Sequence, residues 1–564
     1  MTEDFSRREF LRAAAWTVGL VGATGAAGTW LPSCTRKQYD LIIRGGRVYD
    51  GRGGPPVVGD VGIRGERIAA VGDLSHASAG MVLDARGLAV TPGFIDVHSH
   101  TDVGLLVNPK AESKIRQGVT TEIAGNCGAS PFPLYGKGAE RNREELRQEF
   151  EVEAEWEDAE GFLRRLEQKK IALNYATLVG HSSIREAVMA LDNRPPTTGE
   201  LEAMKREVAR AMEQGALGLS TGLEYTPGCF ASTAEIVELC KVVRKYGGLY
   251  ATHMRNEDVR VEEALEEAIQ IAQQADVPLQ VSHLKACQQR NWHKTPRLLE
   301  RLGQMSRQGL RVHCDRYPYT AYGTTLKLMF PMWAREGSDE DFVARLQNDA
   351  QWEEMHRHLE ERVAALGSWD RVLITKVGGE GNPAAQGKTV QQLAEESGAD
   401  PCQVVRQLLI EAQGKVAMCG FAMSEENTER VLAFPLTMVG SDGEAVAPYG
   451  ILGKGNPHPR FYGTFPRYFG YYVRERGILP LEEAVRRVTS LPAQVFGLQD
   501  RGVLAKGAYA DIVVFDPRQI RDRATFTEPH QYPVGVVHVV VNGRLVIYNE
   551  EHTGCLPGRV LRRA

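Results

Sequence analysis

The chain has 564 residues, with 67 Lys and Arg against 72 Asp and Glu, and a formal net charge of −5. This balance excludes a basic nucleic-acid-binding protein and an acidic tail protein. Nine cysteines are too few for a disulfide scaffold, and their odd number leaves at least one unpaired within the chain. The composition indicates a globular protein large enough for roughly two to four domains.

Residues 1–34 have the layout of an export signal. Arg7 and Arg8 precede an uncharged, Ala- and Gly-rich stretch over 13–34, and the paired arginines resemble a twin-arginine signal peptide. The stretch is long enough to span a membrane, but its glycines and threonines would make a poor membrane helix. It ends in Leu-Pro-Ser-Cys, which resembles a lipoprotein box. We therefore expect an exported bacterial protein, periplasmic or in the cell envelope, with Cys34 as the candidate for lipid attachment.

Short β-strand patterns lie at both ends of the remaining chain. They cover residues 39–43, 47–49, 61–63, 67–71, 512–515 and 536–541. Val-Asn-Gly at 541–543 predicts a hairpin turn. We therefore expect residues 35–87 and 498–564 to form one small β-sandwich.

Between these ends, apolar strand patterns alternate with helical patterns, which predicts βα units around a parallel sheet. The predicted strands are 89–98, 118–125, 174–180, 216–221, 248–253, 278–283, 311–317 and 437–442. Among the predicted helices, one is capped by Ser232, and another, Val261–Ala275, has small and aliphatic residues on one face. Eight strand–helix repeats predict a (β/α)8 barrel.

The connection between the seventh and eighth strands is much longer than the others, at roughly 120 residues. It contains helical patterns over 353–366, 390–396 and 401–411. We expect an inserted helical lid or subdomain over 320–430. Strands one to seven of the barrel then occupy 88–319, and strand eight with its closing helices occupies 431–497.

Side chains that can bind a metal lie where five of the predicted strands end. They are His98, His100, Cys127, His253, His283 and Asp442. Barrels of this kind carry their active sites at the C-terminal strand ends, and alternation along a strand places His98 and His100 on one side. A single histidine there would more often be a core residue. The whole set, however, matches the ligands that zinc prefers, and it predicts a metal site.

Longer motifs around these residues resemble the amidohydrolase superfamily and, within it, the N-acyl-D-amino-acid deacylases (D-aminoacylases). These motifs are Gly93–Asp102, Glu112–Thr121, Gly125–Gly128, Gly218–Tyr225, His253–Arg255, Ser282–Lys285, Asp315–Tyr319 and His458–Arg460. The resemblance covers roughly residues 39–548, and its motifs are spread over the whole predicted barrel.

The resemblance implies that Cys127, His253 and His283 hold a tightly bound zinc ion. The other three predicted ligands would line a second metal position that is weakly filled or empty. In most binuclear relatives a carboxylated lysine bridges the metals, whereas the D-aminoacylase branch is similar to this chain in offering a cysteine. The implied reaction is hydrolysis of a small-molecule N-acyl-D-amino acid to a carboxylate and a free D-amino acid.

In the expected mechanism, zinc polarises the amide carbonyl and binds the attacking water, whose pKa falls towards ~7. Asp442 is expected to accept the proton of this water and pass it to the leaving nitrogen as general acid and base. The alternative for Asp442 is a pure metal ligand or a turn residue before Gly443.

A free α-carboxylate on the substrate needs a cationic clamp. Arg460 and Lys285 are the candidates, and the arginine fork suits a carboxylate better than the lysine ammonium. Tyr225 and either Tyr317 or Tyr319 would add hydroxyl donors. The alternative for Arg460 is a surface residue in a Pro-rich loop.

Other activities stay open at this point. A dipeptidase acting on peptides with a C-terminal D-residue would cleave the same kind of bond. A cyclic amide hydrolase of the hydantoinase or dihydroorotase type, or a metal-free binding protein on this scaffold, is a more distant alternative. The sequence has no GxGxxG or P-loop pattern, which disfavours nucleotide cofactors. We expect no nucleic-acid partner, and membrane attachment only through a lipid on Cys34.

Overall fold

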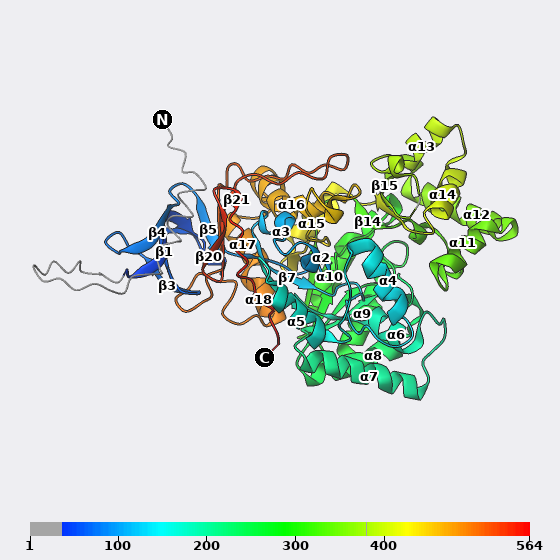
Figure 1. The fold of residues 1–564 in the computed structure, drawn as a ribbon, viewed down its shortest axis with the longest axis horizontal. Coiled ribbons are helices and arrows are strands. Elements are labelled where there is room, and N and C mark those ends of the chain that lie inside the picture. The colour runs from blue at the N-terminus through cyan, green and yellow to red at the C-terminus, as the bar shows by residue number, and fades with distance from the viewer. Residues whose placement is uncertain (1–36, 380, 564) are drawn as a thin grey trace, which may run out of the picture. The chain divides into compact units, whose positions relative to one another are not determined.

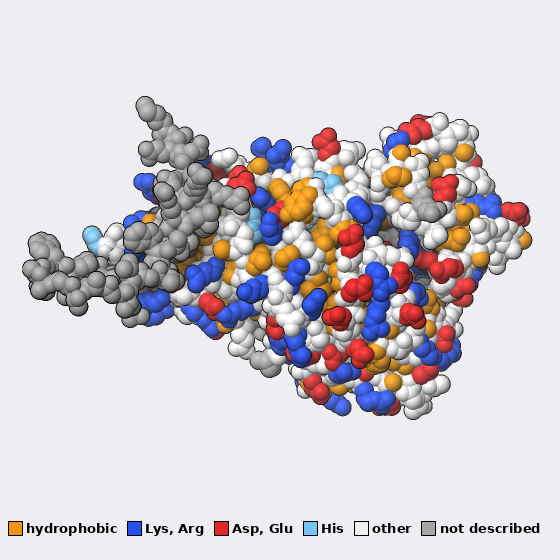
Figure 2. All heavy atoms as spheres, in the orientation of Figure 1, with side chains coloured by type: hydrophobic (Ala, Val, Ile, Leu, Met, Phe, Trp, Pro, Cys, Tyr) orange, Lys and Arg blue, Asp and Glu red, His pale blue; other side chains and the backbone are white. Residues whose placement is uncertain are grey.

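The computed structural model describes residues 37–379 and 381–563 (Figure 1). The predicted export signal and Cys34 lie outside these residues. In the described part of the chain, no helix is both long and apolar enough to cross a membrane. On the face drawn in Figure 2, Lys and Arg side chains are interspersed with Asp and Glu.

The two ends of the chain pair in one sheet, as predicted. Its order is β21-β20-β19-β18-β5-β1-β2-β3, with β4 beside β1. The two ends meet where Val90 of β5 faces Val514 of β18 in an antiparallel pair. The strands are β1 (Tyr39–Val48), β2 (Val57–Arg64), β3 (Arg67–Gly72), β4 (Ala79–Asp84), β5 (Ala89–Pro92), β18 (Ile512–Phe515), β19 (Val536–Val541), β20 (Arg544–Tyr548) and β21 (Glu551–His552).

The predicted hairpin turn lies between β19 and β20. Asn542 and Gly543 have φ angles of 45° and 74°, the left-handed conformation that Asn and Gly adopt most readily. The turn is therefore confirmed at the predicted residues.

The barrel strands form two parallel runs, β6-β7-β8 and β17-β13-β12-β11-β10-β9. Leu178 alone separates β8 from β9, which together make the predicted third strand. At the other junction a parallel bridge joins Ser99 to Gly443. The strands are β6 (Phe94–Asp96), β7 (Val119–Ala124), β8 (Asn174–Thr177), β9 (Val179–Gly180), β10 (Gly218–Gly222), β11 (Leu249–His253), β12 (Leu279–Val281), β13 (Val312–Arg316) and β17 (Thr437–Val439). Over the described residues this confirms the (β/α)8 barrel.

The predicted first barrel strand, 89–98, is in fact two strands. β5 belongs to the terminal sheet, and only β6 enters the barrel. Gly93 lies between them, and a Cβ at Gly93 would lie 2.0 Å from Thr120 Oγ1. A side chain at Gly93 would therefore clash with the neighbouring strand β7.

Helices follow most barrel strands and cover them with apolar faces. α9 has the predicted bounds, and the predicted apolar residues such as Leu265 and Ile271 are buried. α8 begins after Ser232, whose hydroxyl accepts the backbone N–H of Glu235 at 3.2 Å. The helices between β6 and β13 are α2 (Gly104–Val107), α3 (Glu112–Ile115), α4 (Ala139–Phe150), α5 (Ala159–Lys169), α6 (His181–Met189), α7 (Thr198–Glu213), α8 (Thr233–Lys245), α9 (Val261–Ala275) and α10 (Thr295–Arg307). Those around β17 are α15 (Glu425–Ala433), α16 (Arg460–Arg467), α17 (Leu481–Val488) and α18 (Ser490–Phe496).

The long connection between β13 and β17 contains the expected insertion, but the insertion is not purely helical. A three-stranded antiparallel sheet of order β14-β16-β15 packs with its helices, and the two share a separate apolar core that includes Phe342, Trp352 and Met418. The elements are α11 (Asp339–Gln347), α12 (Asp349–Leu366), α13 (Val390–Ser397), α14 (Pro401–Glu411), β14 (Tyr322–Thr325), β15 (Val372–Val377) and β16 (Val416–Gly420).

Candidate active site

The six predicted ligands meet at the C-terminal ends of the barrel strands. Cys127 Sγ lies 3.3 Å from His98 Nε2, 3.5 Å from His283 Nε2 and 4.0 Å from His253 Nδ1. The last two ring nitrogens are 3.1 Å apart. Asp442 Oδ1 lies 3.4 Å from His98 Nε2 and 3.0 Å from His100 Nε2. Such a concentration of thiol, imidazole and carboxylate atoms is the donor set of a zinc site.

Three of these residues have a strained backbone. Cys127, His283 and Asp442 have φ angles of 51°, 33° and 50°, a left-handed region that residues other than glycine seldom adopt. Such strain costs roughly 1–3 kcal/mol per residue and persists where the surrounding structure imposes it, often at functional sites. Each of the three residues lies in the turn two or three residues after the end of its strand.

The surroundings of Cys127 favour a thiolate. Burial by itself raises the pKa of the thiol. The positive charges of His98 and His283, together with hydrogen bonds from His100 and His253, outweigh burial and hold the pKa well below its ordinary value. A thiolate is the form of cysteine that binds a metal.

The carboxylate of Asp442 is also held in its charged form. Burial alone would raise its pKa, but the charges of Arg460, His283 and His98 hold it well below the ordinary range. Arg460 Nη1 lies 2.7 Å from Asp442 Oδ2. Asp442 is therefore an ionised carboxylate within the ligand cluster.

Two buried acids that the sequence reasoning missed orient the ligand imidazoles from behind. Asp315 Oδ1 lies 3.2 Å from His98 Nδ1 and accepts the backbone N–H of His283 at 2.9 Å. Glu257 Oε1 lies 3.0 Å from His283 Nδ1. Carboxylates that contact the far nitrogen of a ligand histidine fix its ring and its tautomer.

Lys114 ties the first and last barrel strands together beneath the site. Its Nζ lies 2.7 Å from Asp96 Oδ2, 2.7 Å from Ser441 Oγ and 3.1 Å from Glu122 Oε1. Burial would lower the pKa of Lys114, but the two carboxylates raise it above its ordinary value. Lys285, the other lysine at the site, lies 2.6 Å from Glu257 Oε2. Both amines are thus held as ammonium groups in ion pairs.

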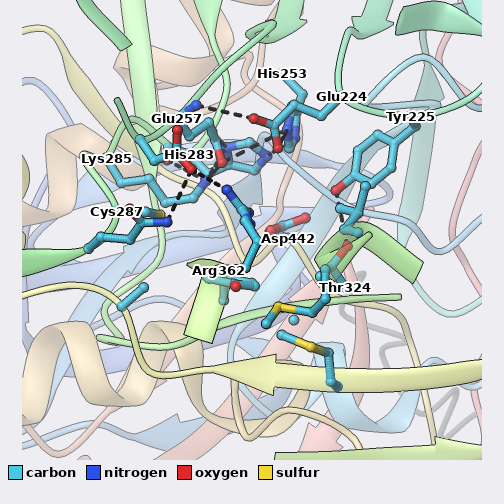
Figure 3. A pocket seen from close by; sticks show the side chains of 18 of the residues that line it. Glu224, Tyr225, His253, Glu257, His283, Lys285, Cys287, Thr324, Arg362 and Asp442 are labelled. Atoms are coloured by element: carbon cyan, nitrogen blue, oxygen red, sulfur yellow. Dashed lines mark hydrogen bonds and ion pairs between the residues drawn. The ribbon is translucent and has the colours of Figure 1, made fainter. Parts of the chain in front are cut away.

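Four of the five predicted substrate-binding residues border the ligand cluster. Lys285, Tyr225 and Tyr317 line a pocket together with His253, His283 and Asp442, which we call the inner pocket (Figure 3). Arg460 lines an adjoining cavity of about 460 Å³, the outer cavity, with His100 and Cys127.

The structure distinguishes the two tyrosines between which the sequence could not choose. Tyr317 is buried in the wall of the inner pocket, and among the described residues its hydroxyl has no hydrogen-bond partner. The hydroxyl of Tyr319 instead donates to Pro459 O at 3.4 Å and lies 3.3 Å from Asp522 Oδ2. Tyr225 Oη lies 3.5 Å from Thr324 Oγ1 at the junction of the two cavities.

Fold and site together define a metal-dependent hydrolase of the barrel type. Residues 81–547 match the amidohydrolase family, to which the chain belongs, within the group of N-acyl-D-amino-acid deacylases. The resemblance predicted from the motifs is therefore confirmed.

Individual relatives match over nearly their whole length. The D-aminoacylase of Alcaligenes xylosoxydans xylosoxydans is 39% identical over 532 residues, which cover 93% of this chain and 98% of the relative. The N-acyl-D-glutamate deacylase of the same organism is 37% identical, covering 94% and 97%. A crystal structure of the N-acyl-D-glutamate deacylase from Bordetella bronchiseptica, complexed with zinc and a phosphonate mimic of the tetrahedral intermediate, is 34% identical and has a TM-score of 0.78, covering 93% and 99%.

Proposed function

We propose that this protein is a zinc-dependent deacylase that hydrolyses the amide bond of N-acyl-D-amino acids and releases a carboxylate and a free D-amino acid. The observation that carries the proposal is a zinc-type ligand cluster bordered by two cations, Lys285 in the inner pocket and Arg460 in the outer cavity. Such a site can bind the negative end of a small acylated amino acid beside its reactive amide.

The ligand atoms fit the proposed metal. Cys127, His253 and His283 would hold the tightly bound zinc ion, because a thiolate and two imidazoles suit a borderline-soft cation. His98, His100 and Asp442 would line the second position. A zinc ion at such a site supplies Lewis-acid activation of the amide carbonyl and of water.

Asp442 performs the proton transfers in this proposal. Its carboxylate is ionised and lies next to the ligand cluster, so it can take a proton from the attacking water. It then delivers that proton to the leaving nitrogen. No other carboxylate among the described residues lies as close to both His98 and His100.

The α-carboxylate of the substrate is held by Arg460 and Lys285, with hydrogen bonds from Tyr317. The guanidinium carbon of Arg460 lies 4.9 Å from the centroid of the Tyr317 ring, and Lys285 Nζ lies 5.9 Å from the same centroid. The two cations therefore approach one aromatic ring whose hydroxyl remains unpaired within the described structure. Tyr225 adds a hydroxyl at the junction of the cavities.

A substrate panel tests the proposal. Zinc-loaded protein is assayed with N-acetyl- and N-formyl-D-amino acids, D-containing dipeptides, hydantoins and the L-isomers. We expect turnover of the N-acyl-D-compounds. Turnover confined to L-substrates would overturn the assignment, and turnover of hydantoins alone would support the cyclic amide hydrolase.

We also propose that the N-terminal segment exports the protein by the twin-arginine route and that Cys34 receives a lipid. The paired Arg7 and Arg8 and the Leu-Pro-Ser-Cys sequence support this proposal. Cell fractionation of wild type, a double Arg7→Lys, Arg8→Lys variant and Cys34→Ser tests it. Retention in the cytoplasm is expected for the arginine variant, and release from the membrane fraction for Cys34→Ser.

A further inference from the structure

A second group of metal-binding side chains lies in the insertion, away from the active site. His356 of α12 meets Asp400 and Cys402 at the start of α14, and one imidazole nitrogen, one carboxylate oxygen and the sulfur atom all lie within 4.8 Å of one another. The two helices pack against each other in the insertion (Figure 1). None of these three residues lines the inner pocket or the outer cavity, so the group is separate from the proposed zinc ligands of the barrel.

The helical period of α12 places His356 at the edge of the apolar core of the insertion. Met355 and Leu359 are fully buried in that core. His356 and Glu360 each follow one of them, and residues four apart lie on the same side of a helix. His356 Nε2 lies 3.8 Å from Glu360 Oε1. The imidazole is stacked on the ring of Trp352, with centroids 5.6 Å apart and planes 6° apart, so its orientation is defined by the core.

Two atoms of the group are buried without a partner. His356 Nε2 is buried and has no hydrogen-bond partner among the described residues. Cys402 is 2% exposed and forms no disulfide within the described chain. A buried imidazole nitrogen that has lost its hydrogen bond to water costs free energy unless a ligand satisfies it. These atoms therefore indicate an occupant between the two helices.

Asp400 caps α14 and keeps one carboxylate oxygen for a ligand. Its Oδ1 accepts the backbone N–H groups of Cys402 at 2.9 Å and Gln403 at 3.2 Å, as an N-cap residue does. These bonds hold the carboxylate in place. Asp400 Oδ2 accepts no hydrogen bond within the described structure, so it remains available to a cation.

The charges around Cys402 favour a cation. Burial and the negative charges of Asp400 and Glu360 raise the pKa of the Cys402 thiol to about 12, so the thiol keeps its proton when no metal is bound. Arg406, further along α14, pairs instead with Asp349 at 2.9 Å. A divalent cation is attracted by the two carboxylates. When it binds, the S–H bond breaks, the proton leaves to solvent and a metal–sulfur bond forms.

We propose that His356, Asp400 and Cys402 bind a zinc ion, with Glu360 as the fourth ligand, and that this ion joins α12 to α14. Thiolate, imidazole and carboxylate are the donors of four-coordinate structural zinc sites. In the sequence β15 and α13 separate the two helices, so the ion would cross-link distant parts of the insertion. None of the four residues takes part in the proposed deacylase chemistry.

Metal binding is tested in the Cys127→Ala background, which lacks the thiolate of the active-site cluster. The metal is first removed with a chelator, and zinc binding is then measured by competition with a chromophoric chelator. We expect this protein to bind one equivalent of zinc more than the Cys127→Ala, Cys402→Ser double variant, with a Kd below about 1 μM. Cobalt in place of zinc should give a thiolate-to-metal charge-transfer absorption that the double variant lacks.

His356→Gln in the same background is the second variant, because His356 is only half-buried and its replacement disturbs the core less than a change at Cys402. It should lose the same equivalent of zinc. Added zinc should raise the Tm of the Cys127→Ala protein more than that of this double variant, because an ion bound only by the folded state stabilises it.

His358→Gln is the matched control. His358 is also a half-buried histidine of α12, but it lines a different cavity of the insertion. Its replacement should leave zinc binding and the cobalt absorption unchanged. Equal numbers of zinc equivalents bound below about 1 μM by the Cys127→Ala protein and its Cys402→Ser and His356→Gln derivatives would overturn the proposed site. If the Cys402→Ser derivative does not fold, the His356→Gln derivative decides the outcome.

Discussion

Arg460 Nη1 lies 2.7 Å from Asp442 Oδ2, so the proposed carboxylate clamp and the proposed proton acceptor form one buried ion pair. Binding of a substrate carboxylate at Arg460 would share the guanidinium between two carboxylates. Recognition of the substrate and the basicity of Asp442 are thereby linked through one side chain.

Arg460→Ala should affect both properties. We expect KM for an N-acyl-D-amino acid to rise at least about tenfold, because a buried cationic contact is lost. The acid limb of the pH profile of kcat should also move to higher pH, since loss of the arginine raises the pKa of Asp442. Arg467→Ala is the control, because Arg467 lies on the same helix as Arg460 and pairs with Asp522 instead. An unchanged KM would contradict the proposal that Arg460 binds the substrate carboxylate.

Asp442→Asn should retain zinc but lose the proton acceptor. We expect kcat to fall by ~10²–10⁴, the usual size of a general-base effect. Zinc content is measured on the same sample, because Asp442 also lies among the ligands of the second position. A loss of less than about tenfold with zinc retained would contradict the assigned role.

Zinc binding should depend on Cys127. Prolonged chelation is expected to abolish activity and added zinc to restore it, while Cys127→Ala should lower the zinc content of the purified protein. Cys240→Ala is the control, since Cys240 is also buried but lies in α8 away from the ligands. Full zinc occupancy in the Cys127 variant would show that the metal is bound without Cys127.

Glu257→Gln tests the acid behind His283. The glutamine can no longer balance the charge of Lys285 or fix the imidazole as a carboxylate does. We expect zinc affinity, measured by competition with a chelator, to fall by ~10–100-fold. Glu267→Gln removes a comparable ion pair with Arg255 outside the inner pocket and should leave the affinity unchanged.

His538 should make the protein less stable in acid. Burial lowers its pKa to about 4, and its Nδ1 accepts the backbone N–H of Asn549 at 3.2 Å. Because the unfolded chain binds the proton near pH 6.5, stability is lost as pH falls from about 6.5 towards 4, by about 2 kcal/mol at pH 5. The Tm of the His538→Gln variant should therefore fall less than the Tm of the wild type between pH 7 and pH 5. His76→Gln, at an exposed histidine, should follow the wild type; equal losses in all three proteins would count against the role of His538.

The ligand set was predictable because one rule places it. Parallel strands in a barrel end at one face, so residues as distant in sequence as His98 and Asp442 can be grouped from their positions at predicted strand ends. The same rule applied to the seventh strand would have found Asp315. Glu257 lies in a loop four residues after His253, where sequence alone does not distinguish a buried partner of Lys285 from a solvent-exposed acid.

Local patterns were less reliable where tertiary contacts decide the outcome. Gly93, at the break between β5 and β6, lies so close to Thr120 that a side chain there would clash, and no local propensity records such a contact. The run Val-Leu-Ile-Thr-Lys-Val at 372–377 has the β-branched residues of a strand. The helical patterns on either side of it nevertheless led us to predict a helical insertion. The left-handed backbone of Cys127 and Asp442 is likewise imposed by the fold, since neither residue is a glycine.

The parallel bridge between Ser99 and Gly443 closes the barrel where its first and last strands meet. The proposed zinc ligands lie on both sides of this seam, with His98 on one flank and Asp442 on the other. A metal ion at the second position, lined by His98, His100 and Asp442, would span this seam and stabilise the closed barrel, because a ligand bound only by the folded state shifts the folding equilibrium towards it. The available zinc concentration would then affect the stability of the folded enzyme as well as its catalytic rate.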